Sequence, residues 1–171
     1  MQRHHVTFFL SGLILCSGCD KDGRTDPDPT AAIERRYNEY RRSFADTPAV
    51  SVVQLLEMMA KRNVVLIDVR TEEEQAVSMI KDALTVAEFE HHRDHYRTGT
   101  IVTYCTIGYR SGLYAKELRR LDFDAHNLEG SILTWIHAGQ PVVDEAGKKT
   151  NRVHVYGPSW NLVPKGYKAV W

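Results

Sequence analysis

Cysteine is scarce in this sequence, and neither positive nor negative charge is in excess. The 171 residues include three cysteines, and 22 acidic residues balance 22 basic ones. A net charge of zero argues against a nucleic-acid partner, which would favour a strongly basic face. Metal-ligand spacing is also missing. His91, His92 and His95 lie closest together among the eight histidines, but no cysteine or acidic cluster completes them. We therefore expect these histidines on the surface, and neither a metal nor another cofactor.

Long hydrophobic runs are missing near the N-terminus. The apolar run over residues 6–15 follows Arg3 and is too short to span a bilayer as a stable helix. A basic start, a short apolar stretch and then small residues are typical of a secretory signal peptide. The letters CSGC, residues 16–19, resemble the lipobox of bacterial lipoproteins, whose last cysteine is lipidated and becomes the new N-terminus. Cys16 departs from that pattern, which usually has leucine or another aliphatic residue there.

Residues 1–18 are therefore predicted to form a signal peptide, and Cys19 to carry lipid. A redox or metal pair of Cys16 and Cys19 is the less favoured alternative, because both lie at the end of an apolar leader rather than on a folded element. We expect an exported protein, anchored by its lipid to a bacterial membrane on the periplasmic or cell-surface side. Cleavage before Cys19 leaves Cys105 as the one free thiol, which is either buried and inert or kept for chemistry.

The rest of the chain alternates between strand and helix patterns. Short runs of valine, leucine and isoleucine predict strands buried on both faces, and these alternate with helical periodicity, so the fold class is α/β with a mainly parallel sheet flanked by helices. The predicted strands cover residues 63–70, 83–85, 100–105 and 125–130, and the helices cover residues 30–45, 52–62, 71–80, 88–96, 109–121 and 131–139. Thr30 and Ser51 are the expected helix caps, and Thr71 with Glu74 fits a capping box.

Three segments follow the predicted signal peptide. Residues 19–48 hold a polar tether and the first helix, residues 49–143 form the α/β domain, and residues 144–171 are an extension expected to pack on that domain. We expect Trp160, Tyr167 and Trp171 to anchor the extension to apolar surface. The alternative is that the extension, including His154, rims the active site.

Cys105 stands at the carboxyl end of a predicted strand, where parallel α/β sheets bind their ligands. The next residues enter a helix, so backbone N–H groups with partial positive charge surround the sulfur. Gly108 permits a tight curl of the loop, and Arg110 adds a cation. Together these groups favour the thiolate and lower the pKa of Cys105. The candidate loop consists of Thr106, Ile107, Gly108, Tyr109, Arg110 and Ser111.

These residues carry a resemblance to a known family. The stretch CTIGYRS, residues 105–111, resembles the active-site loop of the rhodanese (sulfurtransferase) family, which often reads C-x-x-G-x-R-S. Upstream, LIDVRTEEE is similar to the family's DVR-x-x-x-E signature, and NLEGSILTWIHAGQPV to its closing stretch. The three motifs occur in the family's order across residues 49–143. One stretch departs: SMIKDA, residues 78–83, replaces a GHIPGA-like segment that mostly supports the fold.

The resemblance implies a three-layer rhodanese-like fold and a persulfide mechanism. Cys105 takes sulfur from a small anionic donor such as thiosulfate and passes it to a thiol or to cyanide. Arg110 then binds the anionic end of the donor, while Thr106 and Tyr109 shape the entrance. Asp68 and Arg70, from the neighbouring strand end, brace the loops, with direct contact between Arg70 and the substrate as the alternative.

Other functions of a cysteine loop stay open. A cysteine phosphatase or arsenate reductase also combines a cysteine, N–H groups and an arginine, but by resemblance it uses C-x5-R, whereas Cys105 and Arg110 give C-x4-R. A non-catalytic binding module with this fold is the second rival, although degenerate members commonly lose the cysteine. A buried filler is the third, but a filler does not need Gly108 and Arg110 beside it.

Membrane attachment through Cys19 is testable in a bacterial host. Changing Cys19 to alanine removes the thiol to which the lipid would be attached, so the variant should move from the membrane fraction to the soluble fraction. Immunoblots of separated fractions measure this, with Cys16→Ala as the matched control that keeps the anchor. A Cys19→Ala protein that stays with the membranes refutes the lipid anchor.

Overall fold

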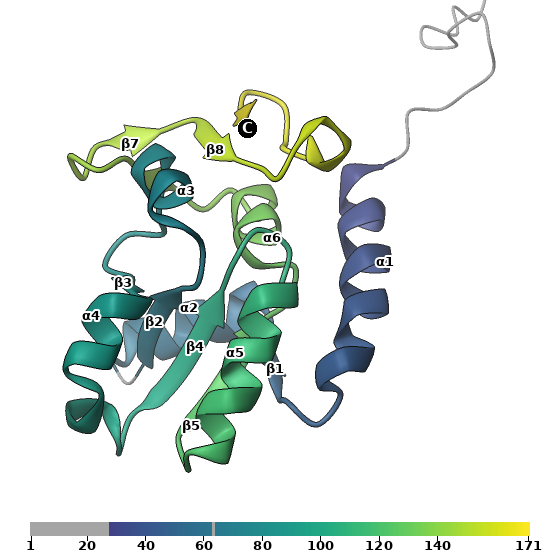
Figure 1. Cartoon of the computed structure of the whole chain (residues 1–171). Coiled ribbons are helices and arrows are strands. Elements are labelled where there is room, and N and C mark those ends of the chain that lie inside the picture. The colour runs from purple at the N-terminus through teal and green to yellow at the C-terminus, as the bar shows by residue number, and fades with distance from the viewer. Residues whose placement is uncertain (1–27, 63) are drawn as a thin grey trace, which may run out of the picture.

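The computed structural model describes residues 28–62 and 64–171. The predicted signal peptide, both N-terminal cysteines and nearly all of the tether lie outside these residues. Within them the chain forms an α/β fold around a five-stranded parallel sheet (Figure 1). The predicted fold class is confirmed.

The central sheet has the strand order β1-β5-β4-β2-β3, with every neighbouring pair parallel. Its strands are β1 (Ala49–Val50), β2 (Val64–Asp68), β3 (Leu84–Thr85), β4 (Thr100–Tyr104) and β5 (Asp124–Leu128). β2 and β4 pair along their whole length, from Val64 opposite Thr100 to Asp68 opposite Tyr104. Because the strands are parallel, Asp68 and the residue after Tyr104 reach the same edge of the sheet.

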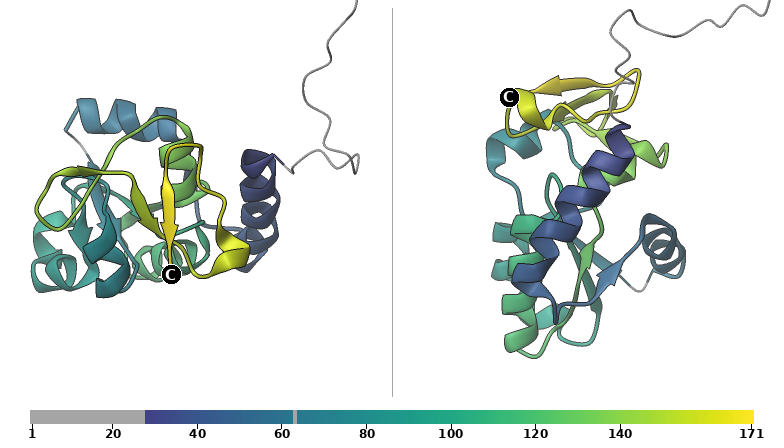
Figure 2. Two further views of the ribbon diagram at one scale, coloured as in Figure 1. Left: turned by 90° about the horizontal axis from the view of Figure 1, so that it is seen from above. Right: turned by 90° about the vertical axis from the view of Figure 1, so that its right-hand side faces the viewer.

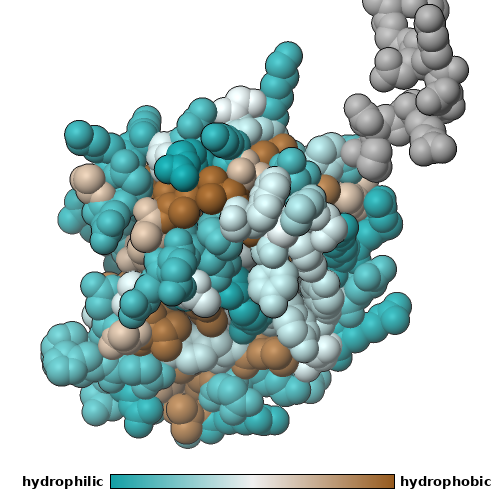
Figure 3. Space-filling model, turned by 45° about the horizontal axis from the view of Figure 1, so that its top comes forward, coloured by the Kyte–Doolittle hydropathy of each residue, from teal (hydrophilic) through white to brown (hydrophobic). Residues whose placement is uncertain are grey.

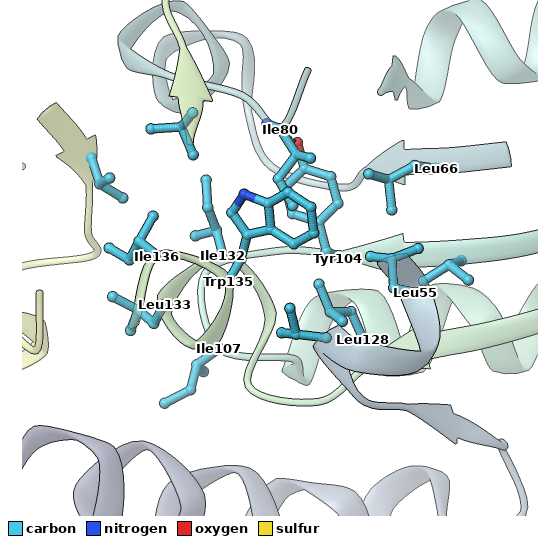
Figure 4. Packing of buried hydrophobic residues seen from close by; sticks show 14 of the residues in the cluster. Leu55, Leu66, Ile80, Tyr104, Ile107, Leu128, Ile132, Leu133, Trp135 and Ile136 are labelled. Carbon is cyan, nitrogen blue, oxygen red and sulfur yellow. Dashed lines mark hydrogen bonds between the residues drawn. The ribbon is translucent and has the colours of Figure 1, made fainter. Parts of the chain in front are cut away.

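Both faces of the sheet are covered, because successive side chains of a strand point to opposite sides. Val102 belongs to one buried cluster with side chains of α2 (Val52–Ala60) and α6 (Ser131–His137). Figure 4 shows Leu55 of α2 and Ile132 of α6 in this cluster. Ile101 belongs to the other, with side chains of α4 (Val86–His91) and α5 (Tyr109–Arg120). Figure 2 shows the resulting three layers edge-on.

Local capping explains where several helices begin. Ser51 with Gln54 starts α2, Thr71 with Glu74 starts α3 (Glu72–Val77), and Thr85 with Glu88 starts α4; each pair forms a complete capping box. The expected cap at Thr30 is wrong. α1 (Pro29–Arg41) begins one residue earlier, and Asp28 caps it by accepting a hydrogen bond from the Thr30 N–H. A carboxylate at that position also meets the positive end of the helix.

The N-terminal helix packs beside the helices that carry the candidate loop. α1 lies along α5 and α6, and the short 3-10 helix η1 (Arg42–Phe44) continues it. A side chain at Gly108 would overlap the ring of Tyr37, and one at Gly112 would overlap the ring of Phe44. Both rings are buried. The two glycines therefore permit close contact between this helical segment and the start of α5.

The C-terminal extension crosses above the edge where the central strands end (Figures 1 and 2). β6 (Val142–Val143) directly precedes it. Its own elements are β7 (Lys149–Thr150), β8 (Arg152–His154), the 3-10 helix η3 (Pro158–Trp160) and β9 (Lys168–Val170). Trp160 and Tyr167 pack against the larger core cluster. Trp171 does not act as an anchor, because 61% of it is exposed. β9, which pairs in parallel with β8, was not predicted.

The outer surface is mostly polar on the face shown in Figure 3, with hydrophobic residues in separate patches. The three neighbouring histidines are exposed. His91 ends α4, His92 follows it, and His95 lies in the 3-10 helix η2 (Arg93–Tyr96). In residues 28–62 and 64–171, no helix has the length and apolar character needed to cross a membrane.

Replacing Gly112 with alanine tests the contact with Phe44. The added methyl group overlaps a ring that is 1% exposed and has little room to move. Overpacking of this kind costs about 1–3 kcal/mol, more than the gain of about 1 kcal/mol that alanine brings inside a helix. Urea unfolding should show lower stability. Gly99→Ala, where a methyl group meets ordinary contacts, should change stability by less than about 0.5 kcal/mol. A more stable Gly112→Ala protein contradicts the packing.

Candidate active site

The loop after β4 curls around the sulfur of Cys105. Gly108 caps α5 with a φ of 109°, a left-handed conformation that glycine adopts without strain. This turn points the Gly108 N–H at the Cys105 Sγ, which accepts its hydrogen bond at 3.2 Å. Cys105 is 2% exposed, yet it lines a pocket. The thiol is therefore enclosed by its own loop and reachable from one side.

Residues at the start of helix α6 hold the backbone of this loop through hydrogen bonds. The Cys105 N–H donates to the Ser131 Oγ at 3.1 Å, and the Cys105 carbonyl accepts from the Ile132 N–H at 3.2 Å. The Thr106 carbonyl accepts from the Leu133 N–H at 3.3 Å. The first N–H groups of a helix have no partner within that helix. Here the loop carbonyls satisfy two of them, which fixes the loop on a rigid element.

A side chain of β5 holds the other end of the loop. Asn127 donates from Nδ2 to the Gly108 carbonyl at 2.9 Å, and its Oδ1 accepts from the Ser111 hydroxyl at 2.7 Å. All three residues are enclosed, Asn127 and Ser111 with no exposed surface. The buried side chains of Asn127 and Ser111 and the Gly108 carbonyl are thus paired with one another, which makes the loop geometry costly to change.

The pKa of Cys105 lies below its ordinary value. Burial by itself raises this pKa, but four other effects together outweigh burial and lower it. They are the hydroxyl and the backbone N–H of Ser111, the charge of Arg110 and the Gly108 N–H. The Ser111 hydroxyl has a single proton, which in this structure goes to Asn127. The backbone N–H groups are therefore the part of this stabilisation that is already aimed at the sulfur.

Arg110 forms a two-pronged ion pair with Glu74 of α3. Nη1 donates to Oε2 at 2.7 Å and Nη2 to Oε1 at 2.7 Å. Glu74 also accepts from the Thr71 N–H of its capping box and from the Thr106 hydroxyl. Burial raises the pKa of Glu74, but Arg110 and Thr71 outweigh it and lower the pKa to about 2. The resemblance implies that Arg110 binds the anionic end of a donor, and in the structure both of its terminal nitrogens bind Glu74.

Asp68 and Arg70 form a second, fully buried ion pair at the end of β2. Arg70 Nη2 lies 2.7 Å from Asp68 Oδ2 and also donates to the Ser78 carbonyl. Gln75 donates from Nε2 to both the Asp68 and the Arg70 carbonyls. Arg70 does not line the pocket, so this geometry fits a bracing role and gives no support to direct contact with a substrate.

The stretch SMIKDA, residues 78–83, serves the same framework. Beyond the Ser78 carbonyl, the Ile80 N–H donates to the Tyr104 hydroxyl at 3.0 Å, and Met79 bridges to Val143. None of these residues lines the pocket at Cys105. Its departure from the family pattern therefore affects the contacts that support β2 and β4 rather than the lining of the pocket.

A pocket of about 340 Å³ opens over Cys105. Three separate parts of the chain build it: α1, the loop with the start of α5, and the C-terminal extension. It is lined by Tyr40, Cys105, Thr106, Ile107, Tyr109, Arg110, Tyr156 and Trp160. Gly108 and Ser111 lie behind the lining, as loop scaffold. The extension does rim the site, through Tyr156 and Trp160 rather than His154.

Several site residues were not anticipated. Tyr40, Tyr156 and Trp160 lie far from the loop in sequence, and no local pattern links them to it. Ser131 and Asn127 belong to a motif that was noticed, but only the fold turns their side chains to the loop. Glu74 was visible as a helix cap. The third Glu of the TEEE run is the one that caps at N3, and this position could have suggested a buried role.

Sequence comparison identifies the family. A model of the rhodanese-like domain matches residues 51–138, about half of the chain. The chain therefore belongs to the rhodanese-like domain family. No curated protein matches the sequence.

Solved structures agree with this fold. A rhodanese-related protein from Thermoplasma volcanium is similar with 25% identity and a TM-score of 0.51, covering 57% of this chain and 99% of that one. A thiosulfate sulfurtransferase from Pseudomonas aeruginosa has 18% identity and a TM-score of 0.54, over 71% of this chain but only 24% of the enzyme. A possible tyrosine phosphatase from Rhodopseudomonas palustris has 20% identity and a TM-score of 0.50, over 64% and 92%. The last two likenesses concern the fold alone.

Replacing Glu74 with glutamine tests the pair with Arg110 through its pH dependence. The folded-state pKa, about 2, lies below the ordinary 4.5, so the carboxylate stabilises the fold fully above pH 4.5 and loses this effect as the pH falls toward 2. We expect Glu74→Gln to lower the free energy of unfolding by about 2–3 kcal/mol at pH 7. The difference from the wild type should shrink below pH 4.5.

Urea unfolding at a series of pH values measures this difference. Glu72→Gln is the matched control, because Glu72 is exposed on the same helix and should have almost no effect at any pH. A constant difference for Glu74→Gln between pH 7 and pH 3 shows that the ion pair does not carry the stabilisation.

Proposed function

We propose that this protein is a sulfurtransferase that carries sulfane sulfur as a persulfide on Cys105. The observation that supports it best is the loop itself: a lone thiol at the bottom of a pocket, with a backbone N–H already bonded to its sulfur and a lowered pKa. Membership in the rhodanese-like family adds the same expectation. An anionic sulfur needs such preorganised donors in both the free and the loaded enzyme.

The first step loads the enzyme. The Cys105 thiolate attacks the outer sulfur of a donor such as thiosulfate, and a new S–S bond forms. The bond inside the donor breaks, and sulfite leaves with its electron pair. The negative charge now lies on the outer sulfur of the persulfide, beyond Sγ and toward the pocket. The nucleophile needs no adjacent base, because electrostatic stabilisation already favours the thiolate.

The second step returns the enzyme to its thiolate. An acceptor thiolate or cyanide attacks the outer sulfur of the persulfide, and the S–S bond to Sγ breaks with its electron pair going back to Cys105. The Gly108 N–H, whose nitrogen lies 3.2 Å from Sγ, donates a hydrogen bond to the restored thiolate and stabilises its charge. Since the loop is tied to α6 and β5, it keeps the same donors in place through both steps.

Phosphate hydrolysis is the rival that the possible tyrosine phosphatase among the structural neighbours suggests. Two observations weigh against it. Both prongs of Arg110 are bound to Glu74, so the guanidinium is not free to hold a phosphate. No aspartate or glutamate is found among the described residues that line the pocket, and so none there can protonate a leaving group.

Export and lipid anchoring belong to the same proposal. They rest on the sequence of residues 1–19, where a short apolar leader ends at Cys19. An anchored enzyme on the outer side of the membrane works where structural thiols tend to oxidise. Enclosure of Cys105 by its loop, at 2% exposure, protects the nucleophile there.

Persulfide formation is the direct test. The full-length protein is incubated with thiosulfate or with benzenethiosulfonate, and mass spectrometry follows the peptide that contains Cys105. We expect this peptide to gain one sulfur atom and to lose it again when cyanide is added, with thiocyanate appearing. Cys105→Ser should abolish both, because it removes the nucleophile while keeping the size of the side chain.

The matched control is Cys19→Ser, which changes a cysteine that the mature chain keeps outside the Cys105 loop and should leave sulfur loading intact. If neither donor loads Cys105, the sulfurtransferase function is wrong. Hydrolysis of an aryl phosphate that disappears in Cys105→Ser would instead establish the phosphatase rival.

A further inference from the structure

Three of the four aromatic residues that line the Cys105 pocket come from outside the part of the chain that matches the family. Tyr40 of α1 lies before residue 51, and Tyr156 and Trp160 of the extension lie after residue 138. Tyr109 of α5 is the fourth aromatic residue of the lining. The rings of Tyr40 and Tyr109 are 5.1 Å apart between centroids, and those of Tyr40 and Trp160 are 6.2 Å apart. The rings of Tyr109, Tyr40 and Trp160 therefore form a continuous aromatic surface at the mouth.

This wall is held in place without a ligand. The Arg36 guanidinium lies over the ring of Trp160, 4.6 Å from its centroid, and Arg36 Nη1 donates to the Ser159 carbonyl at 2.9 Å. These contacts fasten the extension to α1. Tyr156, by contrast, is 76% exposed at the rim. An aromatic side chain left that open gains most from a ligand that covers it.

The electrostatics of the pocket do not favour a small anion with two charges. Arg110 is the one residue with a formally charged side chain, apart from Cys105 itself, among the described residues of the lining, and Glu74 compensates it in a two-pronged pair. Once Cys105 is a thiolate, the remaining positive character comes from backbone N–H groups that already serve the sulfur. A donor with two negative charges is repelled by the thiolate about twice as strongly as a donor with one charge at the same distance.

We infer that this pocket selects an organic sulfur donor with an apolar, ring-sized body, and that Tyr156 and Trp160 determine this selectivity. The inference rests on the proposed sulfurtransferase function and names its substrate class. A volume of about 340 Å³ lies within the range of roughly 300–1,000 Å³ that pockets for organic ligands have, and such pockets are mainly apolar and aromatic. Stacking on the wall places the organic body away from the loop.

The chemistry of loading is unchanged for such a donor. With an organic thiosulfonate, Sγ of Cys105 forms a bond to the outer sulfur, and the bond between that sulfur and the sulfonyl sulfur breaks. The electron pair leaves with the organic part as a sulfinate, and the enzyme keeps a persulfide. The donor carries one negative charge rather than two, and its organic group points out of the loop toward Tyr156 and Trp160.

Two thiosulfonates that differ only in their organic group test this. Benzenethiosulfonate and methanethiosulfonate are given to the full-length protein with cyanide as the acceptor, and kcat/KM is measured for each. The ratio of the two values should fall about tenfold in Tyr156→Ala and in Trp160→Ala, because contact with an apolar group is worth this much in a binding pocket. The intrinsic reactivity of each donor is the same for every variant, so the change in the ratio measures the contribution of the substituted aromatic residue alone.

Trp171→Ala is the matched control, since Trp171 is an exposed aromatic residue of the same extension that does not line the pocket. Its ratio should equal that of the wild type. Tyr156→Ala remains informative if Trp160→Ala does not fold, because Tyr156 is mostly exposed. If both variants load from the two donors with an unchanged ratio, the selectivity is wrong while the sulfurtransferase function stands. If the wild type forms no persulfide with either thiosulfonate, the selectivity is wrong, and if thiosulfate also fails to load Cys105, the sulfurtransferase function is wrong as well.

Discussion

One carboxylate joins the parts of this protein that have to meet at the sulfur. Glu74 closes the capping box that starts α3, accepts a hydrogen bond from Thr106 of the loop and binds both prongs of Arg110 at the start of α5. Its side chain is 5% exposed. A buried carboxylate is tolerated only when its oxygens are paired. The turn after β2 and the loop after β4 therefore have to keep one relative position, and the position of Cys105 follows from it.

Under the proposed function, the chemistry and the selectivity of the site would come from different parts of the chain. Cys105, Gly108 and Arg110 lie inside the region that matches the rhodanese-like family, together with the α6 and β5 groups that hold them. The aromatic residues that a substrate would touch first come mainly from the segments on either side. A loop this strongly tied leaves little freedom to change its own contacts. Under the proposed function, substrate preference would then be adjusted through the flanking segments.

Local patterns in the sequence predicted most of the fold. Runs such as residues 64–68 read as buried strands, and Thr71 with Glu74 read as a cap, because both signals depend on near neighbours. Thr30 was misjudged because Asp28, two residues earlier, already caps the helix by accepting a hydrogen bond from the Thr30 N–H. β9 is three residues long, too short to show a period, and exists through its pairing with β8. The ion pair of Arg110 and the aromatic wall required tertiary structure, because their partners are distant in sequence.

Gly108 packs against Tyr37, and Gly112 packs against Phe44. These contacts determine the shortest fragment of the chain that should fold by itself. Cutting the chain at the start of the family match would remove both rings. Two glycines shaped for aromatic neighbours would then face water, and the first turn of α5 would lose the side chains that press on it. Helices that lose their packing fray from the ends, and this end carries the cysteine loop. Fusions, truncations and crystallisation variants should therefore begin no later than α1.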